Sequence, residues 1–104
     1  MLKIISPITG EHLRIAESDL EIEMEWLDAN KACNELHNGW RLPTKSEFEI
    51  IYKEIHKSGN GNFKNAQYWT KTMGFVFSIE GGCAFSISNL ESKKHVRAVQ
   101  PLYG

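Results

Sequence analysis

Thiols and imidazoles are the side chains of this chain that could bind a metal ion or act in catalysis. The two cysteines, Cys33 and Cys83, lie far apart in the sequence. The four histidines fall in four different segments, without the close spacing on one helix or strand that metal ligands usually show: His12, His37, His56 and His95. Each histidine is therefore expected to be a surface or helix-capping residue. We expect no metal site and no cofactor.

Serine hydroxyls are frequent in residues 77–92, but no Gly-x-Ser-x-Gly turn accompanies them, and no acid and base lie nearby in the pattern of a nucleophile site. The sequence therefore offers no recognisable catalytic residue. We expect a binding or structural module rather than an enzyme.

Composition favours one ordinary globular domain spanning residues 1–104, with 41% hydrophobic residues and a formal net charge of -1. Residues 11–35 contain eight acidic and two basic residues, whereas residues 36–104 contain nine basic and five acidic ones. We interpret this asymmetry as two differently charged solvated faces. The near-neutral charge lacks the uniform attraction that nucleic-acid binders show, so no nucleic-acid partner is expected.

The first seven residues contain an apolar run too short for a signal-peptide core, and no stretch approaches the roughly twenty apolar residues of a membrane span. These features predict a cytoplasmic protein without a membrane partner. In that compartment both cysteines are expected to be reduced and buried.

The sequence of the N-terminal third predicts β-strands. Residues 2–6 and 12–16 flank Pro7-Ile8-Thr9-Gly10, which predicts a β-hairpin. Leu20, Ile22 and Met24 alternate with glutamates, a period of two that predicts a further strand with one buried face.

Two helices are predicted next. Over residues 26–37, apolar residues spaced three and four apart form one stripe, consisting of Trp26, Ala29, Cys33 and Leu36. Asn38-Gly39 is expected to end this helix. Thr44 followed by Glu47 forms the pattern of a capping box at the start of the second helix. Its buried stripe is predicted to be Phe48, Ile51, Tyr52 and Ile55.

Short strands are predicted after the polar loop at residues 58–62, at residues 68–72, 75–79, 83–88 and 96–100. Gly81-Gly82 predicts a tight hairpin between the second and third of them. Helices and strands are segregated along the chain, which indicates an α+β fold with antiparallel sheets.

The segment from Trp40 to Phe48, which reads WRLPTKSEF, resembles the WRLPT-x-x-E signature of bacterial C-type-lectin-like domains. More specifically, the chain resembles the family of unknown function named after the C-terminal domain of the Legionella collagen-like protein. The residues that carry this resemblance, or that it implies to be structural, are Trp26, Cys33, Trp40, Arg41, Leu42, Pro43, Thr44, Glu47, Trp69 and Arg97.

The resemblance implies two helices beside small antiparallel sheets, with the first and last strands close together, and a non-catalytic module that recognises a protein or glycan through loops. It assigns the three tryptophans to packing rather than to a sugar-stacking platform. Arg41 is expected to pair with an acid and fix the loop between the helices, with an anion clamp as the alternative.

Two departures from related proteins bear on function. Family members often carry a cysteine in the last strand that pairs with a cysteine in the first helix. Here the first-helix cysteine is present as Cys33, but the position that matches its partner is Ala98. That disulfide cannot form, which agrees with a reducing compartment. The calcium motifs of animal lectins are also missing, since Gln100-Pro101 is followed by Leu102 and no Trp-Asn-Asp occurs.

Other readings remain open. The block from Arg41 to Glu49 is similar to a segment of the formylglycine-generating oxidases, so a degenerate relative of those enzymes is one alternative. A phage or prophage structural component is another, with an exported protein or phage particle as the corresponding location.

If the domain has a binding face, we expect it on the loops at residues 59–65, 73–75 and 89–95, because loops held by a scaffold often carry recognition. The candidate ligand-binding residues are Asn62, Phe63, Phe75, Asn89, Lys93, Lys94 and His95.

Overall fold

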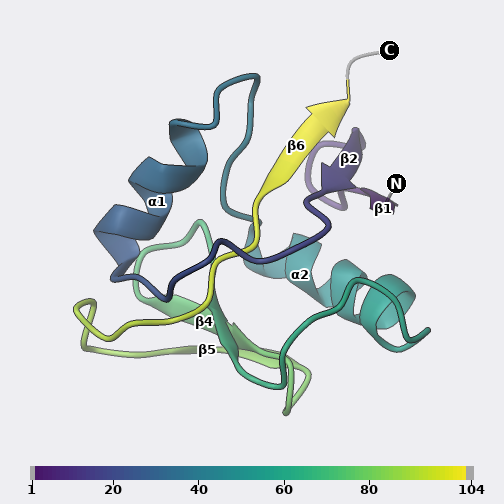
Figure 1. The fold of residues 1–104 in the computed structure, drawn as a ribbon. Helices are drawn as coiled ribbons and strands as arrows, with labels where there is room; N and C mark the ends of the chain where they lie inside the picture. The colour runs from purple at the N-terminus through teal and green to yellow at the C-terminus, as the bar shows by residue number, and fades with distance from the viewer. Residues whose placement is uncertain (1, 103–104) are drawn as a thin grey trace.

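A computed structural model describes residues 2–102 of the chain. It contains two α-helices and two three-stranded antiparallel sheets, so the expected α+β class is confirmed (Figure 1). The elements in chain order are β1 (Leu2–Ile5), β2 (His12–Ile15), α1 (Trp26–Asn34), α2 (Lys45–Ile51), the π-helical turn η1 (Tyr52–His56), β3 (Gln67–Trp69), β4 (Phe75–Ser78), β5 (Cys83–Ser86) and β6 (Val99–Leu102).

The first sheet has the order β1-β2-β6 and joins the two ends of the described chain. The predicted N-terminal hairpin is present, with Leu2 opposite Ile15 and with the amide of Gly10 donating to the carbonyl of Ser6. Strand β6 then pairs with the other edge of β2, where Val99 lies opposite Ile15. The first and last strands therefore belong to one sheet, on either side of β2.

The second sheet has the order β3-β4-β5 and separates two apolar clusters. Because side chains alternate across a strand, Tyr68 and Phe77 enter one cluster with the buried face of α2, while Trp69 and Val76 enter the other with the buried face of α1. A four-residue loop, residues 79–82, joins β4 to β5 and includes the predicted glycine pair. The predicted hairpin is thus confirmed.

The expected strand over Leu20, Ile22 and Met24 is wrong. The chain bends at residues 21–22, and Met24 forms only an isolated bridge with Lys94. Ile22 is 66% exposed. The alternation of apolar and acidic residues is real, but a bend in its middle prevents a continuous hydrogen-bonded ladder.

Other element boundaries also differ from expectation, and the strands expected at residues 68–72 and 83–88 are shorter, at Gln67–Trp69 and Cys83–Ser86. Helix α1 ends at Asn34, because His37 and Asn38 both adopt a positive φ, and Leu36 is consequently 44% exposed rather than buried. The second helix continues beyond Ile51 as the π-helical turn η1, which leaves Tyr52 only half-buried. The last strand is shifted to Val99–Leu102, since residues 96–98 make isolated hydrogen bonds to residues 16 and 20 instead.

Both cysteine side chains were expected to be buried, and this is correct only for Cys33. Cys33 is completely buried on the inner face of α1, whereas Cys83 is exposed at the start of β5. Neither forms a disulfide. The reason is that β5 lies at the margin of its sheet, so its side chains are covered less than those of β4.

Candidate functional site

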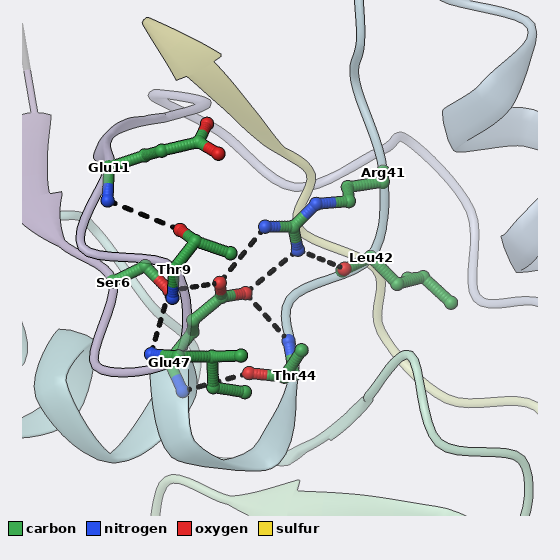
Figure 2. A network of polar contacts seen from close by, with 8 residues as sticks. Ser6, Thr9, Glu11, Arg41, Leu42, Thr44 and Glu47 are labelled. Carbon is green, nitrogen blue, oxygen red and sulfur yellow. Dashed lines mark hydrogen bonds and ion pairs between the residues drawn. The ribbon is translucent and has the colours of Figure 1, made fainter.

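A buried ion pair between Arg41 and Glu47 ties the interhelical loop to the first turn of α2 (Figure 2). The two guanidinium nitrogens donate to the two carboxylate oxygens at 2.8 and 2.9 Å. The same carboxylate accepts from the backbone N–H of Thr44 at 2.9 Å and from the hydroxyl of Ser6 at 2.7 Å. The glutamate of the predicted capping box is therefore also the acidic partner that was predicted for Arg41.

This arrangement makes Glu47 a structural group. Burial by itself would raise the pKa of Glu47, but the hydrogen bonds from Arg41, Thr44 and Ser6, together with the charge of Arg41, lower that pKa to about 2. A carboxylate has about four acceptor positions, and all four are used here. Glu47 is therefore suited to hold the loop and unsuited to accept a proton in catalysis.

A second polar network centres on Asp19 and Arg97, which are 78 positions apart. Arg97 is completely buried and donates from Nε to Asp19 at 2.9 Å. Its other nitrogens donate to the carbonyls of Ala16, Gly61 and Asn62. One guanidinium therefore joins three chain segments. This geometry agrees with the structural role expected of Arg97.

Asp19 also lies close to two further ring side chains, those of Tyr68 and His95. The hydroxyl of Tyr68 donates to Asp19 at 2.7 Å and accepts from the backbone N–H of Lys64. Burial raises the pKa of Tyr68, and the neighbouring carboxylate raises it further. The ring of His95 packs beside Tyr68, and its Nδ1 lies 3.9 Å from Asp19. Asp19 was not singled out in the sequence, where it is one of eight acidic residues in a run.

A polar pocket of about 290 Å³ opens next to this network. His95 is positioned there by the backbone, because its N–H donates to Gln67 and its carbonyl accepts from Trp69, which pairs it with β3. The Oε1 atom of Gln67 is buried without a hydrogen-bond partner among the described residues. The residues that line the pocket are Glu23, Ala66, Gln67, Ser78, Glu80, Lys93, Lys94 and His95.

The pocket offers both signs of charge in a small space. Two carboxylates, two ammonium groups, an amide, a hydroxyl and an imidazole surround it. Such a set can donate and accept hydrogen bonds toward one polar group of a ligand. The volume is near the lower limit of about 300 Å³ for small-molecule pockets, so it suits a single side chain or sugar ring.

The structure brings together only some of the candidate ligand-binding residues. Lys93, Lys94 and His95 line the same pocket. Asn62 and Phe63 line a different hollow, of about 240 Å³, and the Phe63 ring lies 4.0 Å from the Arg97 guanidinium as part of the second network.

The remaining two candidates lie elsewhere. Phe75 is half-buried, with the Lys45 ammonium 3.8 Å from its ring centre. Asn89 is exposed and accepts from the backbone N–H of Glu91, which shapes the turn that leads into residues 93–95.

A larger hollow of about 520 Å³ runs along α1 and was not anticipated. It meets the polar pocket at Glu23 and Lys93, which line both. Four carboxylates face it, from Glu23, Glu25, Asp28 and Glu35. The acidic residues noted in the sequence therefore line this hollow together with Lys31 and Lys93, and the hollow adjoins the polar pocket.

The thiols and imidazoles do not converge. Burial raises the pKa of Cys33 to about 12, so this thiol is inert at neutral pH. Within residues 2–102, no three side chains of His, Cys, Asp or Glu are grouped so that they could hold a metal ion. None of the helices in this part of the chain has the length and apolar character of a membrane span.

The tryptophans occupy the packing positions that were expected of them. Trp26 and Trp69 are buried, and their indole N–H groups donate to the carbonyls of Thr70 and Met24. Trp40 is partly buried against the same cluster. No family model matches the sequence, and a comparison with curated proteins finds no match.

Proposed function

We propose that this chain is a non-catalytic, C-type-lectin-like binding module that recognises a polar group of a protein or glycan in the pocket formed by residues 93–95. The observation that carries the proposal is the pocket itself, in which Lys93, Lys94 and His95 line about 290 Å³ together with Glu23 and Glu80. Gln67 also lines the pocket.

The way the pocket is supported agrees with a recognition site. Its loop is anchored at Lys94 by backbone bonds to Met24 and at His95 by backbone bonds to β3. Behind it, Asp19 and Arg97 provide a second layer of hydrogen bonds. A backbone fixed in this way before binding loses little freedom when a ligand binds, which favours affinity.

The charge pattern supports a small polar ligand over a nucleic acid. Glu23 and Glu80 lie beside the two lysines, so the pocket does not present the one-signed surface that phosphate backbones require. The sequence resemblance to bacterial lectin-like domains supports the same class of function, and the α+β arrangement with first and last strands in one sheet is compatible with it.

The test is a binding screen against two defined probes, a printed array of oligosaccharides and an array of short peptides. We expect the wild-type protein to bind members of one array, and the double variant Lys93→Ala/Lys94→Ala to lose at least about tenfold in affinity, as removal of two charge-assisted contacts implies. The matched control is Lys3→Ala/Lys71→Ala, which removes two exposed lysines outside the pocket. Equal loss in both double variants, or no binding to either array, would refute the proposal.

A further inference from the structure

The loop that joins β4 to β5, residues 79–82, borders two different hollows. One is the polar pocket of residues 93–95, which Glu80 lines. The other, of about 360 Å³, shares no lining residue with that pocket and is named the η1 hollow after the helical turn beside it. The residues that line the η1 hollow are Glu49, Tyr52, Lys53, Lys57, Gly81 and Gly82.

The helical turn η1 is of a rare type, and this type shapes the hollow. In an α-helix, residues five positions apart lie about 140° apart around the axis, so Tyr52 and Lys57 would point in different directions. Here the N–H of Lys57 donates to the carbonyl of Tyr52 at 3.0 Å, which is the i→i+5 bond of a π-helix. The Lys57 ammonium consequently lies 5.5 Å from the centre of the Tyr52 ring. Single π-helical turns occur frequently at functional sites, which is a first indication of a ligand here.

The β4–β5 loop forms a fixed wall of the η1 hollow. A Cβ at Gly82 would lie 2.7 Å from the Tyr52 ring, so a glycine is required for the backbone to approach the ring this closely. The N–H groups of Gly81 and Gly82 donate to the hydroxyl and the carbonyl of Ser78, at 3.0 and 2.7 Å. The wall is therefore in place before a ligand binds, which lowers the cost of binding.

The polar side chains around the η1 hollow are not used by the fold. Within residues 2–102, Lys53 and Lys57 form no ion pair. In the same part of the chain, the carboxylate of Glu49 and the hydroxyl of the half-buried Tyr52 have no hydrogen-bond partner. These four groups are therefore free to contact a ligand, unlike the saturated carboxylate of Glu47.

The charges and hydrogen-bonding groups define the ligand. Two ammonium groups and one carboxylate are complemented by a ligand with a single negative charge. A phosphate monoester, with a charge of about −1.5 to −2 at pH 7, would be repelled by Glu49. The Glu49 carboxylate accepts hydrogen bonds and the Tyr52 hydroxyl both donates and accepts them, so the pair suits the hydroxyl groups of a ligand. The volume of about 360 Å³ lies within the usual range of small-molecule pockets, about 300–1,000 Å³.

We infer that the η1 hollow binds an acidic sugar, a hydroxylated ring that carries one carboxylate, such as a uronic acid. The sugar carboxylate accepts charge-assisted hydrogen bonds from Lys53 and Lys57, and the ring hydroxyl groups bond to Glu49 and Tyr52. The faces of the Tyr52 ring are not a stacking platform, because Lys57 and Gly82 lie against the ring. Recognition is therefore polar, and it is independent of the pocket of residues 93–95.

Titration of isotope-labelled protein with sodium D-glucuronate, followed through the backbone amide NMR signals, tests the ligand class. We expect saturable shifts at Lys57, Gly81 and Gly82. D-glucose, which has the ring without the carboxylate, should produce no saturable shift at the same concentrations. Inorganic phosphate should bind at least about tenfold more weakly than glucuronate, since it gains no hydroxyl contacts and faces Glu49. No saturable shift with glucuronate, an equal response to glucose, or phosphate binding as tight as that of glucuronate would overturn the inference.

Two matched lysine pairs test the location. Lys53→Ala/Lys57→Ala should weaken glucuronate binding at least about tenfold, as the loss of two charge-assisted contacts implies. Lys93→Ala/Lys94→Ala, which alters the other pocket, should leave glucuronate binding unchanged. Unchanged binding in the first double variant, or an equal loss in the second, would contradict the site.

Two single variants test the roles of the hydroxyl and the carboxylate. Tyr52→Phe keeps the ring and both lysines and removes only the hydroxyl, so glucuronate binding should weaken about fivefold. Glu49→Gln removes the charge that repels phosphate, so the preference for glucuronate over phosphate should shrink about threefold. If neither variant changes binding, the lysines attract anions by charge alone, and the assignment to an acidic sugar is wrong.

Discussion

Replacement of Glu47 by glutamine tests whether the Arg41–Glu47 ion pair stabilises the fold through its charge. The carboxylate is completely buried, and its pKa falls from the ordinary 4.5 to about 2. At about 1.4 kcal/mol per pH unit, this difference corresponds to about 3 kcal/mol of stability near pH 7. Breaking one side of a buried ion pair costs a similar amount, about 3–5 kcal/mol. We therefore expect Glu47→Gln to lower the free energy of unfolding by about 3 kcal/mol at pH 7.

The pH dependence distinguishes charge from packing. Because the pKa of Glu47 is lower in the folded protein, its contribution is complete above pH 4.5 and is lost as the pH falls from 4.5 toward 2. The gap between wild type and variant should accordingly shrink to about 1 kcal/mol at pH 3. Urea unfolding followed by tryptophan fluorescence at pH 7 and at pH 3 measures both values.

The control is Glu49→Gln, two residues further along α2 and exposed. It should change the unfolding free energy by less than about 0.5 kcal/mol at either pH, as is usual for surface substitutions. A gap between wild type and Glu47→Gln that stays constant from pH 7 to pH 3 would refute the electrostatic reasoning, because the loss would then come from packing alone.

Two further predictions concern packing and the resemblance to lectin-like domains. Gly82→Ala should destabilise the protein by about 1–3 kcal/mol more than Gly10→Ala in urea unfolding: both glycines have a positive φ, but a Cβ at Gly82 would lie 2.7 Å from the Tyr52 ring, whereas a Cβ at Gly10 meets nothing within 4 Å. Equal losses would show that backbone strain alone matters. Ala98→Cys should form a disulfide with Cys33 on oxidation if the resemblance to lectin-like domains holds, because that resemblance implies this pair and both residues are buried in the same cluster; thiol counting should find only Cys83 free, and three free thiols would count against the resemblance.

The sequence alone was sufficient wherever the signal is local. The capping box at Thr44 and Glu47 and the hairpin turn around Gly10 depend on residues within a few positions of each other, so their patterns predict the observed hydrogen bonds. The alternation within β4 likewise indicated a strand next to a glycine turn. Even the acidic partner of Arg41 lies only six positions away, so an ion pair could be anticipated. The use of all four acceptor positions of Glu47 could not be anticipated.

Only the tertiary structure decided the rest, because those features join residues that are distant in the sequence. Nothing local distinguishes Asp19 from the acids around it; its role follows from Arg97 and Tyr68 arriving beside it. The bend that ends the alternation at Ile22 and the exposure of Cys83 on a sheet edge follow equally from which segments cover which. Residue types and spacing determined most of the elements and the N-terminal cap of α2, whereas the polar pocket and the outer position of β5 in its sheet exist only because long-range packing places some backbone and side-chain groups together and leaves others uncovered.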